Sequence, residues 1–381
     1  AVVASTPSSG AAPQSAWTGV ERIVAVGDLH GDYENFLKIM QNKEVGLLDK
    51  NLHWTGGKTH FVQTGDIMDR GYSPPPKPGE NSSGARDIFD LIRKFEPEAQ
   101  KAGGMVHLLL GNHEELAIIR KSFDYHDADR RPESSYVSIN QFLSFLPEAH
   151  RQALINRFKK HDVNPFAFWN SVLEDEDERN IYFDFFEEHY GHWLAEQNVI
   201  IKINGIVFVH GGLSLRDSQR SLDEINTIYH EEFQRYLSTR GEMSFRTRML
   251  YAGSSAPLWN RDLAIKPESD YRETVDQILA NLGAQHIVVA HTPTLALGGQ
   301  FRFGGRVYII DTGISRVYPG GYLSALIITD GDLHLWKGEQ HGQENSRNDG
   351  RGGIGLSAGV VHSPVAFARG ARDPCAARPR A

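Results

Sequence analysis

Five short apolar runs in this chain each end in a cluster of Gly, Asp, Asn or His, and this pattern limits the folds open to it. Apolar runs of about four to six residues that stop at glycine and polar residues are typical of buried strands. The runs cover residues 23–26, 60–63, 105–110, 206–209 and 287–290. In open α/β sheets, sites form outside the carboxyl ends of the strands, so clusters spread over about 260 residues can converge on one crevice.

The other patterns in the sequence also indicate an α/β fold. Helix-like stretches at 33–40 and 114–121 follow the first and third runs, and runs at 307–310, 323–328 and 332–336 resemble antiparallel strands separated by Gly-rich turns. Between Phe123 and about Gln197, apolar residues recur at helical spacing. We therefore expect a helical insertion there, within one catalytic domain at 20–338.

The two ends have a different composition. Residues 1–19 lack an initiating Met and are rich in Ala, Ser, Pro and Gly, and we expect a flexible segment left by processing. This favours an exported or periplasmic protein, with the cytoplasm as the alternative. Residues 339–381 show no periodicity and many Gly and Arg, so we expect a disordered tail.

Composition excludes several classes of chemistry. The 40 basic and 48 acidic residues give a net charge of −8, which argues against a nucleic-acid partner or binding to an anionic membrane. No apolar run reaches the roughly 18 residues of a membrane span. The single cysteine, Cys375, has Ala381 six positions later, where cysteine-dependent phosphatases carry an Arg. Any chemistry must come from His, carboxylates, Arg or a metal.

The clusters GDLHG, GDIMDRG, GNHEE, VHGG and AHTP supply carboxylate, amide and imidazole donors, a set suited to divalent first-row metals. The candidate ligands are Asp28, His30, Asp66, Asn112, His210 and His291. Six ligands exceed one tetrahedral site. If Asp66 bridges, Asp28 and His30 complete one metal, and the other three complete a second. The donors admit Mn, Fe, Zn or Co, and the other histidines, including His60 and His107, are interpreted as structural.

The order of these clusters resembles the calcineurin-like metallophosphoesterases, and GDLHG, GDIMDRG, GNHEE and HGG are similar to the phosphoprotein phosphatase branch. Within it, the long insertion, WNRD at 259–262 and the AHTP ending resemble the Shewanella-like bacterial protein phosphatases. The resemblance implies two mixed β-sheets packed as a sandwich flanked by helices. It also implies that the six residues named above are metal ligands.

The resemblance further implies four catalytic residues. His113 would protonate the leaving oxygen and Asp69 would pair with it, while Arg70 offers a planar fork for two phosphoryl oxygens. A second phosphate-binding Arg is expected, and Arg261 is our choice, with Arg246 and Arg248 in SFRTRML as alternatives. The chain departs from the eukaryotic serine/threonine members at two places, with Leu110 before GNHEE and DTGISRVYPGG near the end. The substrate and inhibitor behaviour of those enzymes is therefore not expected of this chain.

The resulting hypothesis is a metal-dependent phosphatase that hydrolyses phosphate monoesters by attack of a hydroxide bridging two metals. Its partner would be a phosphorylated protein, through phosphotyrosine or phosphoserine/threonine, or a small phosphomonoester; the sequence leaves the oligomeric state open. One alternative is a dinucleoside polyphosphate hydrolase or phosphodiesterase of the same fold. Another is a phosphate-binding scaffold without activity, but such a scaffold would be marked by a lost ligand or a lost His113–Asp69 pair, and all are present.

Overall fold

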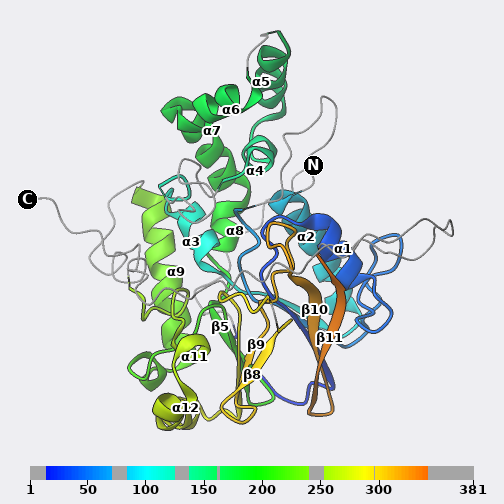
Figure 1. The fold of residues 1–381 in the computed structure, drawn as a ribbon, viewed down its shortest axis with the longest axis vertical. Coiled ribbons are helices and arrows are strands. Elements are labelled where there is room, and N and C mark those ends of the chain that lie inside the picture. Colours follow the sequence, from blue (N-terminus) through cyan, green and yellow to red (C-terminus); the bar gives the residue numbers. More distant parts are fainter. Residues whose placement is uncertain are drawn as a thin grey trace, which may run out of the picture.

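The structure of the chain, a computed structural model, describes residues 14–70, 84–124, 137–160, 164–239, 253–295 and 297–341. Within these ranges two β-sheets pack face to face, helices cover their outer sides, and a group of helices projects beyond them (Figure 1). The two mixed sheets flanked by helices confirm the predicted fold class.

The first sheet has five strands in the order β11-β10-β2-β3-β4. Strands β2, β3 and β4 are parallel, and β10 is antiparallel to both of its neighbours. The strands are β2 (Arg22–Val26), β3 (His60–Gln63), β4 (Met105–Leu108), β10 (Tyr322–Thr329) and β11 (Asp332–Gln340). Because β2, β3 and β4 are parallel, their carboxyl ends lie at one edge of the sheet.

The second sheet has six strands in the order β1-β5-β6-β7-β9-β8, with β6, β7 and β9 parallel. The strands are β1 (Ala16–Trp17), β5 (Ile200–Ile203), β6 (Ile206–Val209), β7 (His286–Val289), β8 (Gln300–Arg302) and β9 (Val307–Ile309). Strand β1 lies inside the segment 1–19 that was expected to be flexible. It forms because β5 offers a parallel edge to it and Trp17 packs against the core between the sheets.

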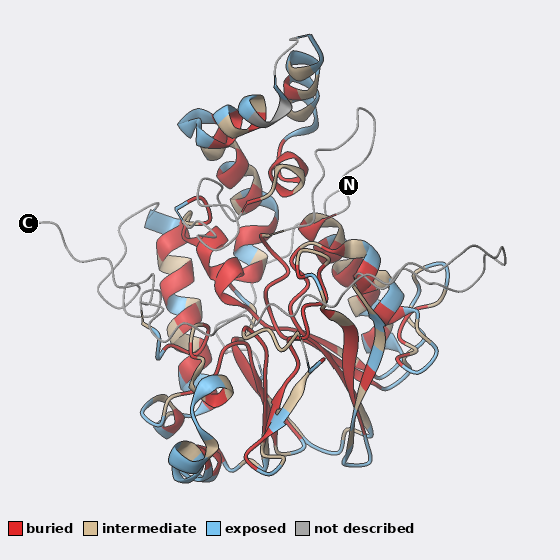
Figure 2. Cartoon of the chain, in the orientation of Figure 1, coloured by how far each residue is buried: buried red, intermediate tan, exposed pale blue. Residues whose placement is uncertain are grey.

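Alternating side chains of both sheets fill the space between them. Ile23 and Ala25 of β2 and Ile206 and Phe208 of β6 belong to one buried cluster. The outer faces are covered by α1 (Tyr33–Met40) and α2 (Ala85–Lys101) on one side and α9 (Leu222–Thr239), α11 (Asp262–Ile265) and α12 (Glu268–Leu282) on the other. Figure 2 shows these helices buried toward the sheets and exposed on their outer sides.

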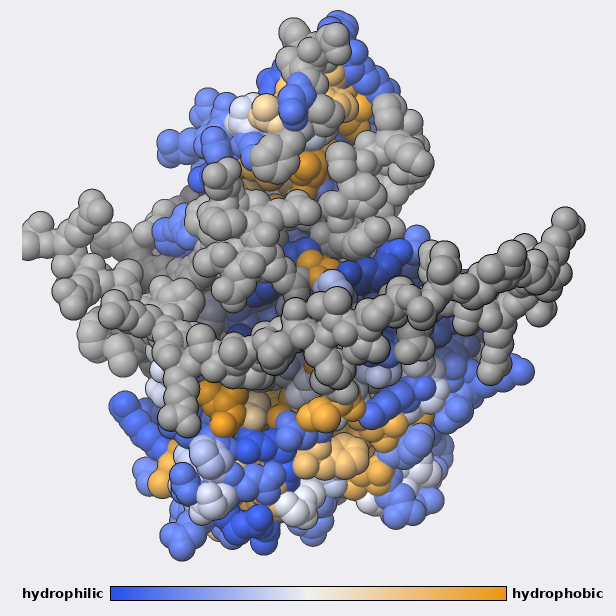
Figure 3. All heavy atoms as spheres, viewed as in Figure 1, coloured by the Kyte–Doolittle hydropathy of each residue, from blue (hydrophilic) through white to orange (hydrophobic). Residues whose placement is uncertain are grey.

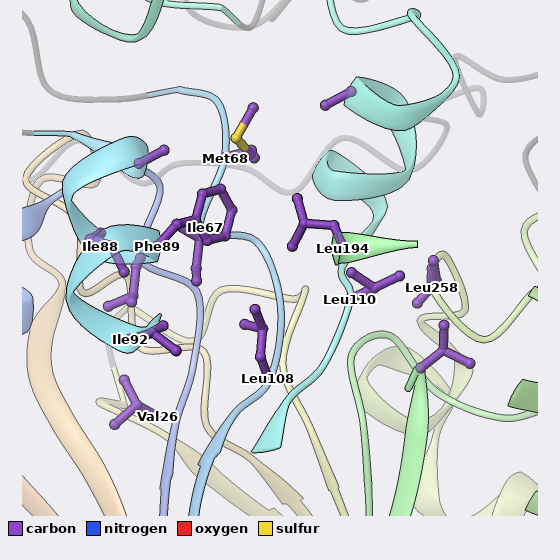
Figure 4. Close-up of a cluster of buried hydrophobic side chains, with 14 of the residues drawn as sticks. Val26, Ile67, Met68, Ile88, Phe89, Ile92, Leu108, Leu110, Leu194 and Leu258 are labelled. Carbon is purple, nitrogen blue, oxygen red and sulfur yellow. The ribbon is translucent and has the colours of Figure 1, made fainter. Parts of the chain in front are cut away.

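A buried apolar cluster lies under the loops at the carboxyl ends of the strands (Figure 4). Val26, Leu108 and Leu110 pack there with side chains of α2 and with Leu194 and Leu258. Each such side chain contributes roughly 1.5–3 kcal/mol when fully buried. This packing supports the loops that follow the carboxyl ends of the strands.

Residues 137–194 form what we call the helical arm. It contains α4 (Ile139–Ser144), α5 (Glu148–Lys160), α6 (Pro165–Glu174), α7 (Glu176–Phe186), a π-helical turn (Glu187–Gly191) and α8 (His192–Leu194). Aromatic rings hold it together, as Tyr182 stacks on Phe142 with 5.7 Å between ring centroids. Figure 3 shows mostly hydrophilic residues at the tip of the arm. None of the helices in the described ranges is long and apolar enough to cross a membrane.

A pair of buried histidines lies between the sheets, beside the N-terminal strand. His107 Nε2 is 3.0 Å from His60 Nδ1, and the Trp17 ring lies 4.3 Å from that of His107. Burial lowers the pKa of His107 to about 3 and also lowers the pKa of His60. Both rings are therefore neutral in the folded protein at neutral pH.

We expect this pair to make the protein acid-sensitive. A folded-state pKa below the unfolded value means that the unfolded chain binds more protons, so stability is complete above about pH 6.5 and falls toward about pH 3. Between about pH 6 and 4, the free energy of unfolding should fall more steeply with decreasing pH in the wild type than in the His107→Gln variant. The difference in slope should be about 1 kcal/mol per pH unit. Urea unfolding at several pH values tests this. Equal slopes in the two proteins would contradict it.

Candidate metal centre

The six candidate ligands come together at the carboxyl ends of the parallel strands, and all are buried. Asp28 and His30 follow β2, and Asp66 follows β3. Asn112 begins α3 (Asn112–Ile118) after β4, while His210 follows β6 and His291 follows β7 by two residues. Each therefore lies where a strand of one of the two sheets ends.

Asp66 lies at the centre of this group. Its Oδ2 is 3.3 Å from His210 Nε2 and 3.9 Å from His30 Nε2. Among the described residues, two sets of three have ligand atoms within 4.8 Å of one another and could hold a metal ion, namely His30, Asp66 and His113, and Asp66, His210 and His291. Because Asp66 belongs to both sets, it is positioned to serve two ions.

Asp28 lies beside the first set rather than within it, and Asn112 lies next to a member of the second. Asp28 Oδ2 is 3.9 Å from His30 Nε2, and Asn112 Oδ1 is 3.0 Å from His210 Nε2. His113 occupies the place in the first set that the sequence assigned to Asp28, because its Nε2 lies 3.8 Å from Asp66 Oδ2. The geometry thus gives His113 two possible roles, ligand and proton donor.

The electrostatics of the group suit a cation. Burial lowers the pKa of His30 to about 3 and that of His291 well below its usual value, so both present neutral imidazole nitrogens. Burial opposes ionisation of Asp66, but His210 and His113 hold the pKa of that carboxyl well below its usual range. His291 Nε2 is buried with no hydrogen-bond partner among the described residues. Carboxylates and neutral imidazoles with unused lone pairs are the donors that first-row divalent ions require.

The backbone at the centre is strained. Such strain costs roughly 1–3 kcal/mol per residue and persists only where the surroundings enforce it. Ten non-glycine residues of the described ranges have positive φ, and five are candidate site residues: His30 (41°), Asp66 (56°), Asp69 (63°), Arg70 (60°) and His291 (63°). The centre is thus held in a conformation that its local sequence does not favour.

Two glycines allow the loops after β3 and β4 to touch. Gly65 has φ of 97°, and a side chain on it would collide with the backbone of Gly111. A Cβ on Gly111 would in turn overlap the carboxylate of Asp66. Both positions therefore need glycine for Asp66 to reach the centre.

Glu114 enforces the strained turn that carries Asp66. Its carboxylate accepts hydrogen bonds from the backbone N–H groups of Asp66, Ile67 and Met68 at 2.8–2.9 Å, and from that of Gly111 at 2.8 Å. It is fully buried. One side chain of α3 thereby fixes the loop after β3 to the start of its own helix.

Replacing Glu114 with glutamine should lower the free energy of unfolding by about 3 kcal/mol. The new amide group would turn a donor toward backbone N–H groups, leaving buried donors unpaired. Urea unfolding measures the loss.

Glu115→Gln provides the matched control. Burial raises the pKa of Glu115 to about 8, so this residue is largely neutral at pH 7, and its main partner is the Trp259 Nε1–H at 2.6 Å. A neutral glutamine keeps that acceptor, so this variant should lose less than about 1 kcal/mol. Equal losses in the two variants would show that the backbone contacts of Glu114 are not the cause.

The four predicted catalytic residues also lie at this edge. His113 Nδ1 is 2.8 Å from Asp69 Oδ2, with both side chains buried. Burial is the main cause of the low pKa of His30, and the charges of His113 and Arg70 lower it further. Arg261 donates to the carbonyl of His291 and to Thr292 Oγ1. The alternatives to Arg261, Arg246 and Arg248, lie outside the described residues.

Two residues at the centre were missed by the sequence analysis. Asp311 follows β9, and burial raises its pKa to about 6; its charge, after burial itself, helps to raise the pKa of Asp28. Tyr318 places its hydroxyl 3.4 Å from His30 Nε2. Asp311 carries the signal used elsewhere, an apolar run that ends in Asp and Gly. Tyr318 has no such signal, because it lies in an irregular loop.

Comparison with known proteins supports the resemblance that the motifs indicated. Residues 21–295 match the family described as Calcineurin-like phosphoesterase. Shewanella-like protein phosphatase 1 of Plasmodium berghei is 27% identical over 317 residues, covering 78% of this chain and 68% of the relative. Shewanella-like protein phosphatase 2 of Arabidopsis thaliana is 42% identical over 98 residues, covering 26% of this chain and 22% of that protein.

Solved structures share the fold. The structure of a cold-active protein tyrosine phosphatase superposes with a TM-score of 0.59 at 22% sequence identity, covering 86% of this chain and 81% of the other. The structure of a cold-active protein-tyrosine phosphatase from a psychrophilic Shewanella species gives a TM-score of 0.57 at 23% identity, over 86% and 82% of the two chains.

Proposed function

The chain belongs to the calcineurin-like phosphoesterases and is related to the Shewanella-like protein phosphatases, and from this premise we propose that it is a metal-dependent phosphatase acting on phosphoproteins. The observation that carries the proposal is the buried donor group around Asp66, with the His113–Asp69 pair on one side and Arg261 on the other. Relatives named as protein phosphatases support the choice of substrate class.

Two divalent ions, of Mn, Fe, Zn or Co, would be held by the six candidate ligands, with Asp66 shared between them. When bound, such ions lower the pKa of a water molecule toward about 7 and stabilise the charge that develops on the phosphoryl oxygens. The chain keeps the imidazoles of His30 and His291 neutral and the Asp66 carboxylate ionised.

The proton that the leaving group needs would come from His113. Asp69 accepts from its Nδ1–H, which fixes the ring orientation and leaves Nε2 facing Asp66. His113 would act as a general acid, with Nε2 as the atom that delivers the proton. Arg70 and Arg261 would bind the phosphoryl oxygens from two sides, since a guanidinium offers paired donors.

A phosphopeptide panel assayed after chelation and metal replacement tests the proposal. We expect hydrolysis of phosphotyrosine or phosphoserine/threonine peptides to stop on chelation and to return with one of the four metals. A dinucleoside tetraphosphate assayed in parallel should turn over more slowly. Faster turnover of the dinucleotide would favour a polyphosphate hydrolase instead, and absence of hydrolysis of both substrates with every metal would refute the proposal.

A further inference from the structure

One side chain of the helical arm reaches into the catalytic centre. Gln141 of α4 is buried, and its Oε1 accepts from the backbone N–H of Asp69 at 2.6 Å. Its Nε2 donates to Asp69 Oδ1 at 2.6 Å and to the Tyr182 hydroxyl at 3.0 Å. Both ends of the Gln141 amide are therefore used, and both contact the residue that pairs with His113.

We propose that Gln141, supported by Tyr182, is a positioning residue through which the helical arm sets the orientation of the proposed proton donor His113. This inference rests on the proposed phosphatase function. Asp69 has one carboxylate oxygen bound to His113 and the other to Gln141. With both oxygens held, the carboxylate cannot rotate, and the His113 ring keeps its Nε2 toward Asp66.

The same contact holds the turn that carries Arg70. Asp69 and Arg70 both have left-handed backbones, with φ of 63° and 60°. Left-handed conformations are unfavourable for such residues, so a hydrogen bond from the Asp69 N–H to a rigid acceptor helps to maintain the turn. Gln141 thus acts on two groups, through its Nε2 on the His113 partner and through its Oε1 on the Arg70 turn.

The arm makes Gln141 a rigid support. Ser138 at the start of α4 accepts a hydrogen bond from the Gln141 backbone N–H. Tyr182 of α7 is locked by its stack on Phe142 and by edge contacts with Phe123 and Phe145. The Gln141 amide is therefore fixed from two helices of the arm, and a shift of a few tenths of an ångström would be transmitted to Asp69.

The two bonds of Gln141 can be separated by substitution. Gln141→Glu keeps an acceptor for the Asp69 N–H but replaces the donor to the carboxylate, whereas Gln141→Met removes both at similar volume. We expect Gln141→Glu to lower kcat about 30-fold for an alkyl phosphate such as a phosphoserine peptide, and less than about threefold for p-nitrophenyl phosphate, whose leaving group needs no proton. The inhibition constant of the Gln141→Glu variant for inorganic phosphate should stay within about threefold of the wild-type value.

Gln141→Met should show the same difference in kcat between the two substrates. It should also weaken phosphate binding about tenfold, because the Arg70 turn loses support.

Controls separate this role from a general effect on the arm. Gln152→Met changes an exposed glutamine of α5 and should leave all constants within about twofold. Tyr182→Phe removes only the hydroxyl, keeps the ring stack, and should lower kcat for the alkyl phosphate about threefold to tenfold. This variant also tests the inference if the Gln141 variants fail to fold by circular dichroism.

The outcomes distinguish the inference from the function on which it rests. Wild-type protein inactive on both substrates would refute the proposed function. Active wild-type protein whose Gln141 variants lose equal activity on the two substrates, or lose none, would overturn the positioning role. If the Gln141 variants do not fold, unchanged kcat in Tyr182→Phe would overturn it.

Discussion

Asp66→Asn is expected to lower kcat/KM for a phosphomonoester by about 10³-fold and to remove most of the bound metal. Asp66 belongs to both candidate metal sets, and its Oδ2 lies 3.3 Å from His210 Nε2. Loss of its charge weakens both sites at once, and metal catalysis supplies several kcal/mol of transition-state stabilisation. Elemental analysis of the purified protein and steady-state kinetics measure the two losses.

Asp332→Asn is the matched control for this substitution. Asp332 is exposed at the first position of β11, where the turn from β10 ends. The register pairs Thr329 with Arg22 at the amino end of β2, so this turn lies away from the carboxyl ends that carry the centre. The control should keep full metal content and activity. If Asp66→Asn retained two metal equivalents, the bridging role assigned to Asp66 would be wrong.

His113→Asn is expected to lower kcat for a phosphoserine peptide by about 10²–10⁴-fold, the range of general acid catalysis. The loss on p-nitrophenyl phosphate should be less than about tenfold, because that leaving group departs without a proton. The amide group of asparagine can take the place of Nδ1 of the ring. It has no atom in the place of Nε2, which faces Asp66. Comparison of kcat for the two substrates measures the effect.

Metal content decides between the two roles that the geometry allows His113. A proton donor can be removed without loss of metal, whereas a ligand cannot. We expect His113→Asn to keep the metal content of the wild type. Loss of one equivalent would identify His113 as a ligand, and full activity on the phosphoserine peptide would refute the general-acid assignment.

The strands that carry the centre were predictable because each is a continuous apolar run. The runs at 60–63 and 206–209 coincide with β3 and β6, and the others match β2, β4 and β7 to within one or two residues. Strands β1 and β8 were missed, since two or three residues carry no period and form only where a neighbouring edge offers hydrogen bonds. Strand β5 was missed although it reads IIKI.

The residues of the candidate site likewise fall into those that the sequence predicts and those that it does not. Asp28, Asp66 and His210 each follow a strand within a few residues, so the sequence pattern identifies them as candidates. Gln141 lies in a short helix, and nothing in its sequence distinguishes it from a surface glutamine; only tertiary packing brings it to Asp69. Glu114 stood in the GNHEE cluster, but its three contacts with the loop after β3 join segments far apart in the chain and could not be predicted from spacing.

The donors around Asp66 come from strands far apart in the chain, and the backbone N–H of His291 reaches the carboxylate of Asp28 across 263 positions. A ligand that binds only the native state adds its binding free energy to the free energy of folding. An ion held by these residues can contribute that energy only when both sheets have formed and met. Metal affinity and assembly of the sandwich are thus thermodynamically linked, even though the helical arm separates β4 from β5 along the chain.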